Sequence, residues 1–410
     1  MRCAKNINAN QINGRKMNDF LHFVETMHAN RYETVVRKLV DEKIPCALFL
    51  PFYPRQYRVN VINQFQKSGM DMKYLISVES ADFNTPPPEN VQLVRFNEIN
   101  SLGKDKPKYV FVIQSPQTVI VVDKFQQIGI EMISIEPSGN TVPIYDFYIK
   151  HLSEIFEVYN DLIDDISKKS FLGYMLCKVT KRLSFCYFDK TEQYILDGFI
   201  PKPGEIVIDA GVCDGSTSAM FADFGCRVIG FEMDSKNFKI ASKLAEKKNF
   251  TVENLGLGEE NREISYTPDK QNMGGGHVNN VQGKITDPNA PKTNIVSLDS
   301  YVREKKLSSV DFIKLDTEGA ELSIFKGAAN TIARFKPKFA AAAYHKLEDV
   351  FTLYQFLKSV RPDYEFAFRH SQTSFENVPF MFPKLLIDMC RAFDVPLKYP
   401  SEAEAVLFAR

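Results

Sequence analysis

The chain has 410 residues, enough for about two or three domains with hydrophobic cores of their own. Hydrophobic residues make up 44% and charged residues 25%, a balance that is ordinary for a soluble globular protein. Basic and acidic residues each total 51, so the formal net charge is zero. The basic excess of a typical nucleic-acid-binding protein is therefore missing, and no nucleic-acid partner is expected.

No run of about eighteen apolar residues occurs, so the sequence predicts no membrane span. The N-terminal segment is polar and lacks the apolar core of a signal peptide, and we expect residues 1–20 to form a flexible tail. The seven cysteines include no Cys-x-x-Cys pair, which argues against zinc-ribbon and thioredoxin-like sites. Their odd number and scattered positions favour a reducing, cytoplasmic location.

Residues 21–145 are expected to form a small N-terminal α/β domain of Rossmann-like type. Its short apolar runs, bounded by Pro, Gly or Ser, are typical of buried parallel strands. Helix-like stretches at Tyr57–Lys67 and Thr118–Gln127 alternate with these runs, which predicts a parallel sheet with helical crossovers. The expected strands are Cys46–Leu50, Tyr74–Val78, Val91–Phe96, Tyr109–Ile113 and Met132–Ile135.

Residues 146–195 are expected to be a helical connector between two domains. Apolar side chains recur every three or four positions from Phe147 to Val158, which is the pattern of an amphipathic helix. The acidic pair Asp164 and Asp165 favours a solvated turn or helix face over a metal site.

Residues 196–410 are expected to form a second α/β domain. The expected strands are Ile206–Asp209, Val228–Glu232, Thr251–Leu255, Ile295–Leu298, Phe312–Asp316, Phe339–Tyr344, Phe366–Arg369 and Ala405–Phe408. The main expected helices are Lys236–Lys247, Glu321–Arg334 and Leu347–Val360. The stretch Gln271–Pro291 is rich in Gly, Pro and Asn, and we expect it to be a mobile loop that serves as a lid.

The strongest local motif is Ile206–Ser218, an apolar strand followed by a glycine-containing turn and a helix start. Gly211 and Gly215 allow the backbone to approach a ligand at the carboxyl edge of a sheet. A dinucleotide site would need Gly-x-Gly-x-x-Gly with bare amides facing pyrophosphate, whereas this turn carries Asp209 and Asp214. These four residues favour S-adenosylmethionine, which is cationic and has no phosphate. The alternative is a strand–turn–helix link that binds no ligand.

Two further strands end in acidic residues. The strand Val228–Glu232 delivers a carboxylate that can accept hydrogen bonds from both ribose hydroxyls, although Glu232 could merely cap the following helix. The segment Asp311–Glu321 places Asp316 and Glu318 at the same sheet edge, where they could hold a hard cation such as Mg²⁺ or supply a base. Asp316 could also cap the helix that follows, which is compatible with catalysis.

Together these segments resemble the FkbM-type methyltransferases. The matching pieces are Asp209-Ala-Gly211, Phe231-Glu232, Ser297-Leu298-Asp299, Ile313–Glu321, Tyr344-His345-Lys346 with Asp349, and Arg369-His370. The string Ile313–Glu321 is the most specific of them, and the resemblance covers about Asp161–Arg410. It implies a class I Rossmann-like methyltransferase domain and S-adenosylmethionine-dependent O-methylation of hydroxyls, often on sugars or polyketides.

The resemblance also implies roles for single positions. Asp209, Gly211 and Glu232 would line the cofactor site, and Asn254 would approach the adenine. Asp316 and Glu318 would face the transfer site. His345 could take the proton of an attacking hydroxyl, or it could be a structural hydrogen-bonding residue. His277 and His370 are weaker candidates.

Other functions compete with an O-methyltransferase of a sugar, glycan or related small molecule. A nicotinamide-dependent sugar-modifying oxidoreductase is disfavoured because Gly-x-Gly-x-x-Gly is missing. A non-catalytic cofactor-binding scaffold is disfavoured by the intact acidic residues, and a nucleic-acid methyltransferase by the neutral charge. The N-terminal domain could recognise the acceptor or form a homo-oligomer.

Overall fold

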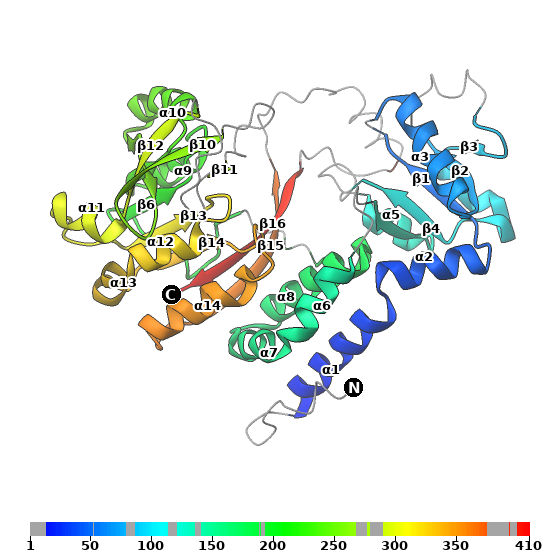
Figure 1. The fold of residues 1–410 in the computed structure, drawn as a ribbon, viewed down its shortest axis with the longest axis horizontal. Coiled ribbons are helices and arrows are strands. Elements are labelled where there is room, and N and C mark those ends of the chain that lie inside the picture. The colour runs from blue at the N-terminus through cyan, green and yellow to red at the C-terminus, as the bar shows by residue number, and fades with distance from the viewer. Residues whose placement is uncertain are drawn as a thin grey trace. The chain divides into compact units, whose positions relative to one another are not determined.

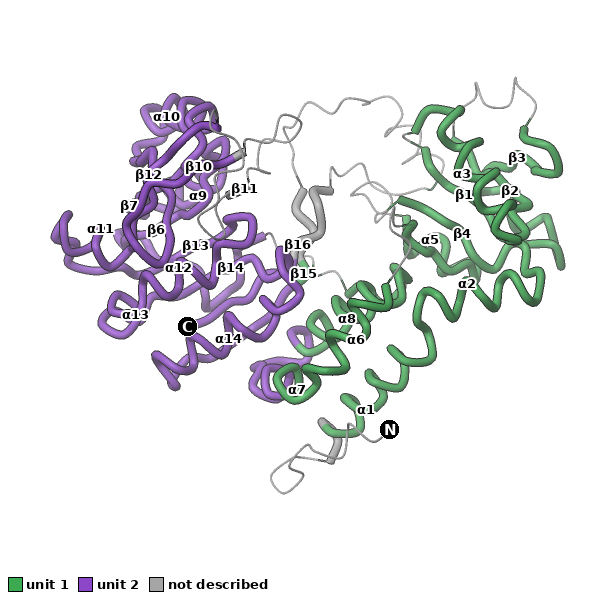
Figure 2. The backbone as a smooth tube through the Cα atoms, in the orientation of Figure 1, with its two compact units in different colours: residues 1–156, 168–190, 370–403 green, residues 157–167, 191–369, 404–410 purple. Residues whose placement is uncertain are grey.

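The computed structural model places the chain in two compact units, which Figure 2 shows in different colours. Unit 1 comprises residues 1–156, 168–190 and 370–403, and unit 2 comprises residues 157–167, 191–369 and 404–410. The residues that the structure describes are 14–51, 53–78, 87–113, 121–135, 141–187, 189, 193–267, 277–278, 290–374, 393 and 400–410.

Unit 1 is built on a five-stranded, wholly parallel sheet with the order β3-β2-β1-β4-β5 (Figure 1). All five strands expected in this region are confirmed, with ends that move by one or two residues. The strands are β1 (Cys46–Phe49), β2 (Met72–Ile76), β3 (Gln92–Val94), β4 (Tyr109–Val112) and β5 (Glu131–Ser134). The prediction of an N-terminal Rossmann-like α/β unit is therefore confirmed.

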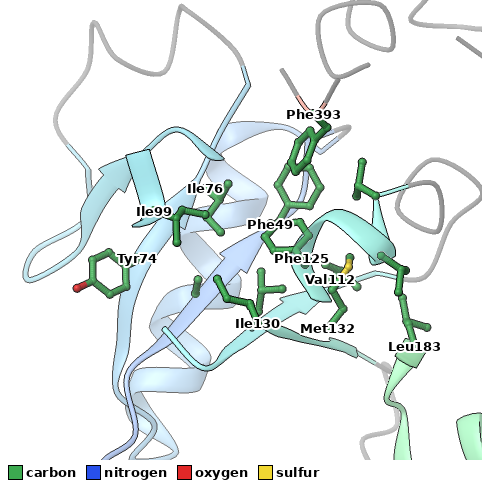
Figure 3. Close-up of a cluster of buried hydrophobic side chains, with 14 of the residues drawn as sticks. Phe49, Tyr74, Ile76, Ile99, Val112, Phe125, Ile130, Met132, Leu183 and Phe393 are labelled. Atoms are coloured by element: carbon green, nitrogen blue, oxygen red, sulfur yellow. The ribbon is translucent and has the colours of Figure 1, made fainter. Parts of the chain in front are cut away.

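Both faces of the unit 1 sheet are buried. Ala47 and Phe49 of β1 enter one hydrophobic cluster, whereas Cys46 and Leu48 enter another on the opposite face. Figure 3 shows the first cluster, in which Phe393 packs against Phe49 at a ring-centroid distance of 5.3 Å. Burial on two faces explains why the strands are continuous apolar runs.

Helices and short 3₁₀ turns complete unit 1 and the connector. They are α1 (Gly14–Ala29), α2 (Tyr32–Asp41), α3 (Arg55–Lys67), η4 (Phe96–Asp105), α5 (Val122–Gln127), α6 (Val142–Lys150), α7 (Leu152–Asp161), α8 (Asp165–Thr180) and η5 (Leu183–Phe185). Helix α1 begins inside the segment expected as a tail. Residues 146–195 were expected to be helical, but among the described residues that follow α8 in this range only η5 is helical. Lys181 adopts a left-handed φ of 58°, which ends α8.

Unit 2 contains a seven-stranded sheet with the order β15-β16-β14-β13-β6-β7-β8. Strand β16 runs antiparallel to β14, and β14, β13, β6, β7 and β8 are mutually parallel. The strands are β6 (Ile206–Ala210), β7 (Arg227–Phe231), β8 (Thr251–Glu253), β13 (Phe312–Leu315), β14 (Lys338–Ala342), β15 (Phe366–Ser374) and β16 (Pro400–Ala409). Seven of the expected strands correspond to this sheet.

The helices of unit 2 fill the gaps between its strands. They are α9 (Ser216–Asp223), α10 (Ser235–Lys248), α11 (Leu298–Glu304), α12 (Glu321–Gly327), α13 (Ala329–Phe335) and α14 (Asp349–Val360). The single helix expected over Glu321–Arg334 is instead two helices. They separate at Gly327, whose backbone lies so close to the carbonyl of Gly258 that a Cβ would overlap it.

A second, four-stranded sheet in unit 2 has the order β11-β10-β12-β9. Its strands are β9 (Gly256–Leu257), β10 (Arg262–Thr267), β11 (His277–Val278) and β12 (Lys292–Val296). The strand expected over Ile295–Leu298 lies earlier, because the Ser297 side chain accepts the Ser300 N–H and so begins α11. Most of the loop expected over Gln271–Pro291 lies outside the described residues. No helix in the described part of the chain is long and apolar enough to cross a membrane.

Candidate active site

Three neighbouring strands of unit 2 end at the same edge of the sheet. The order β13-β6-β7 is parallel throughout, so the loops that follow these strands lie side by side. Backbone hydrogen bonds join them: Gly211 N–H donates to Phe231 O at 3.1 Å, and Asp316 N–H donates to Ala210 O at 3.1 Å. The structure thus brings the three predicted acidic segments together at one edge.

The turn after β6 has a backbone that requires glycine. Gly211 has a φ of 79°, and a Cβ there would overlap the carbonyl oxygen of Asp316. Gly215 has a φ of 92° and directly precedes α9. A Cβ added to Gly215 would lie 3.3 Å from atoms of Phe250 and Ala241, so the space beside it is already filled. The exposed Asp214 caps this turn, because its carboxylate accepts the Ser216 N–H at 2.9 Å. The turn is therefore fixed by contacts within the chain.

Asp209 lies beneath this turn and not on its surface. Its side chain is fully buried, with Lys314 Nζ 3.1 Å from Oδ1 and the Ser218 hydroxyl donating to Oδ2 at 2.6 Å. Lys314, which lies beside Asp209 in the register of β6 and β13, also donates to the carbonyl oxygen of Gly211 at 2.8 Å. The described partners of Asp209 are within the chain, and the pair with Lys314 holds the turn from below.

Glu232 follows β7 and lies at the turn itself. One carboxylate oxygen accepts the Cys213 N–H at 2.8 Å, and the other accepts the Asp234 N–H at 2.8 Å. Burial raises the pKa of Glu232, and the two N–H groups oppose that rise. Asn254 donates its side-chain N–H to the carbonyl oxygen of Glu232 at 2.9 Å, so the end of β8 supports the same residue.

Asp316, at the end of β13, is held by two tyrosines, of which sequence analysis quoted Tyr344 in a family motif and did not mention Tyr194. Tyr194 donates its hydroxyl hydrogen to Oδ2 at 2.6 Å, and Tyr344 donates to Oδ1 at 3.2 Å. The side chain remains 24% exposed, so the carboxylate is both fixed and accessible.

His345 joins the acidic residues of the β13 loop through both ring nitrogens. Nδ1 lies 2.9 Å from Oε1 of Glu321, a fully buried carboxylate that also accepts the Thr317 N–H at 2.8 Å. Nε2 lies 3.4 Å from Asp316 Oδ1 and 3.6 Å from Glu318 Oε2. Burial by itself would lower the pKa of His345, but the hydrogen bond and charge of Glu321, with the charges of Asp316 and Glu318, raise it to about 9.

The two weaker histidine candidates lie elsewhere. His370 is buried in unit 1, where its ring meets Tyr174 edge-on. His277 begins β11, and its side chain lies outside the described residues.

Lys314 could have been noticed in the sequence, because a lysine inside a buried apolar strand needs a partner. Nothing in the sequence pairs Tyr194 with Asp316, since 122 positions separate them.

A parallel sheet with one antiparallel strand near its end, and with three acidic strand ends at one edge, places unit 2 among the Rossmann-like methyltransferases. The family model described as the Methyltransferase FkbM domain matches residues 209–377. Residues 209–377 therefore match the FkbM methyltransferase domain, as the sequence motifs predicted.

One solved structure supports this fold, and two others show a weaker likeness. A methyltransferase FkbM from Methylobacillus flagellatus superposes with a TM-score of 0.60 over 96% of this chain and 99% of that chain, at 15% identity. A precorrin-6y C5,15-methyltransferase from Geobacter metallireducens is 9% identical and has a TM-score of 0.31, covering 54% of this chain and 93% of that chain. The fibrillarin of Aeropyrum pernix is 11% identical and has a TM-score of 0.28, covering 51% of this chain and 67% of that chain. No curated protein sequence matches significantly.

Proposed function

We propose that this protein transfers the methyl group of S-adenosylmethionine to a hydroxyl group of a sugar, a glycan or a related small molecule. The observation that carries the proposal is the meeting of Glu232 and Asp316 at one sheet edge, on either side of the turn at Gly211. The FkbM domain at residues 209–377 supports methyl transfer as the reaction class.

Glu232 suits the ribose of S-adenosylmethionine. Each of its oxygens accepts one backbone N–H, and each can accept a further hydrogen bond, so the carboxylate can also bind two ribose hydroxyls. Asn254 supports Glu232 and lies where we expect the adenine. The exposed carboxylate of Asp214 would attract a sulfonium or ammonium group and repel a pyrophosphate.

The transfer site would be formed by Asp316, Glu318 and His345. When bound, S-adenosylmethionine supplies a methyl group on positively charged sulfur, and the residues of the chain align the acceptor hydroxyl and take its proton. Tyr194 and Tyr344 hold Asp316 in place for this task. With a pKa of about 9, His345 carries a proton at neutral pH, and the two carboxylates are then the groups that accept the hydroxyl proton.

Calorimetry with S-adenosylmethionine and with NAD tests the cofactor assignment. We expect the wild-type protein to bind S-adenosylmethionine and not NAD. Replacing Glu232 with Ala should weaken binding by about tenfold or more, because hydrogen bonds to a charged group are lost. Glu304→Ala, at an exposed position on α11, is the matched control and should bind as the wild type does. Binding of NAD alone would overturn the assignment and favour an oxidoreductase.

A methyl-transfer assay tests the acceptor class. Radiolabelled S-adenosylmethionine should transfer label to at least one member of a panel of sugars, nucleotide sugars and glycans. Binding of the cofactor without transfer to any hydroxyl compound would favour the non-catalytic scaffold. We propose that unit 1 serves acceptor recognition or assembly. Assaying each acceptor class separately would show which class receives the methyl group.

A further inference from the structure

We propose that Tyr194 positions both halves of the candidate active site, with its hydroxyl group serving the transfer site and its ring serving the cofactor turn. This role rests on the proposed function, and it belongs to a residue that precedes the family-matched region 209–377. Tyr194 lies in the segment before β6 and is 4% exposed. It contacts Asp316 through its hydroxyl group and Lys314 through its ring.

The hydroxyl group of Tyr194 is oriented by two hydrogen bonds. It accepts a hydrogen from the side-chain amide of Gln193 at 2.7 Å, and it donates its own hydrogen to Oδ2 of Asp316 at 2.6 Å. A phenol has a single hydrogen to donate, and a short hydroxyl–carboxylate contact of this kind is charge-assisted and strong. The bond therefore fixes one oxygen of Asp316, while the Asp316 side chain stays 24% exposed and open to an acceptor.

The ring of Tyr194 packs on the buried lysine that holds the cofactor turn. Lys314 Nζ lies 5.2 Å from the ring centroid, within the range of a cation–π interaction. The same ammonium group lies 3.1 Å from Asp209 Oδ1 and donates to the carbonyl oxygen of Gly211 at 2.8 Å. Cation–π contacts are strongest where water is excluded, and the Lys314 side chain is only 3% exposed. The ring therefore helps to keep this ammonium group beneath the turn.

The backbone at Tyr194 adopts a conformation that bulky residues avoid. Its φ is 63°, in the left-handed region that a large side chain enters at an energetic cost. The ring is packed in the hydrophobic cluster that contains Phe199 and Val207, which offsets part of that cost. Strained conformations persist where surrounding contacts over-determine them, and they gather at functional sites. The contacts with Asp316 and Lys314 are of that determining kind.

One rigid ring between the two groups sets their relative position. Lys314 lies within β13 and Asp316 directly follows that strand. Methyl transfer needs the methyl donor, the acceptor hydroxyl and the group that takes its proton in one alignment, and a small misplacement lowers the rate strongly. Because Tyr194 contacts both residues, it aligns the carboxylate of Asp316 with the turn where we expect the methyl donor.

Two substitutions separate the two roles. Tyr194→Phe removes the hydroxyl group and keeps the ring, so calorimetry should give the wild-type affinity for S-adenosylmethionine while kcat for methyl transfer falls by about tenfold or more. Tyr194→Leu also removes the ring, and it should in addition weaken S-adenosylmethionine binding by about threefold to thirtyfold. Tyr187→Phe, at a 41% exposed tyrosine, is the matched control and should change neither quantity.

The proposal is overturned if Tyr194→Phe transfers methyl groups at the wild-type rate, or if folded Tyr194→Leu binds S-adenosylmethionine as tightly as the wild type does. An equal loss of affinity and kcat in both variants would show a merely structural role and would also overturn it. Tyr194→Phe keeps the buried ring, so it decides the matter even if Tyr194→Leu does not fold.

The wild-type sample separates failure of this role from failure of the proposed function. A wild type that binds no S-adenosylmethionine, or that transfers no methyl group, refutes the proposed function and the role of Tyr194 with it. A wild type that binds and transfers, beside variants that behave in the same way, refutes the role of Tyr194 alone.

Discussion

The buried pair of Asp209 and Lys314 offers a quantitative test of how unit 2 holds its turn. The two side chains are 0% and 3% exposed, and their charged atoms lie 3.1 Å apart. Removing one member of such a pair leaves a buried charge without its counterion, which costs about 3–5 kcal/mol. We therefore expect Asp209→Asn and Lys314→Met each to lower the stability of unit 2 by that amount. The double variant should recover about 1–3 kcal/mol of the summed loss, because neither charge remains.

Hydrogen exchange resolved by peptide is the appropriate assay, since it reports on unit 2 separately from unit 1. The amides of β6 and β13 should exchange faster in both single variants, while those of β1 and β4 keep their wild-type rates. Affinity for S-adenosylmethionine should fall in parallel, because Lys314 no longer holds the carbonyl of Gly211. Single variants that cost less than about 1 kcal/mol, or a double variant that costs their full sum, would refute the reasoning.

Two further predictions concern other parts of the chain. Burial, followed by the charge of Glu321, raises the pKa of Asp349 from 3.8 to about 7. Folded protein therefore keeps a proton that the unfolded chain loses, and stability should fall by up to about 4 kcal/mol as pH rises from 4 to 7. Asp349→Asn should flatten this decline in denaturant titrations, and an equal loss at pH 5 and pH 8 would contradict it. Phe393→Ala, at a 1% exposed ring, should cost unit 1 about 3–5 kcal/mol. Amide hydrogen exchange in β1 and β4 should become faster in this variant, and an equal change in β6 would contradict the prediction.

The central strands of the two main sheets could be predicted because they are buried on both faces, whereas the edge strands β3 and β8 are partly exposed. All five residues of β6 are buried, for example, and such continuous apolar runs have few alternatives. Strands β9, β10 and β11 were not predicted, and β11 lies inside the stretch Gln271–Pro291 that was expected to be a loop. Strand β10 begins with exposed Arg262 and Glu263 and is short of apolar residues, so its sequence carries little signal on its own. Its pairing with β12 stabilises it, and that pairing depends on the fold.

The candidate site was predictable in its location and less so in its contacts. An acidic residue at the end of a parallel strand must lie near the carboxyl edge of the sheet, which placed Asp209, Glu232 and Asp316. Whether each carboxylate points outward depends on its neighbours. Asp209 turns inward because Lys314 stands beside it on β13, a register that no local pattern reveals. From the sequence, Glu321 looks like an ordinary acidic residue in the first turn of a helix. Its contact with His345, which follows β14, forms only in the folded chain.

Unit 2 is discontinuous in the gene, and this affects how its activity can be isolated. Arg369 is 5% exposed, and its guanidinium group bonds to Asp164 at 3.0 Å and to the Ser167 hydroxyl at 2.5 Å, residues that precede the family-matched region. A shortened gene that encoded only residues 209–377 would discard Asp164 and Ser167, along with strand β16. Such a fragment would expose the edge of β14 and invite aggregation, so a fragment for expression should begin before Asp164 and extend through β16.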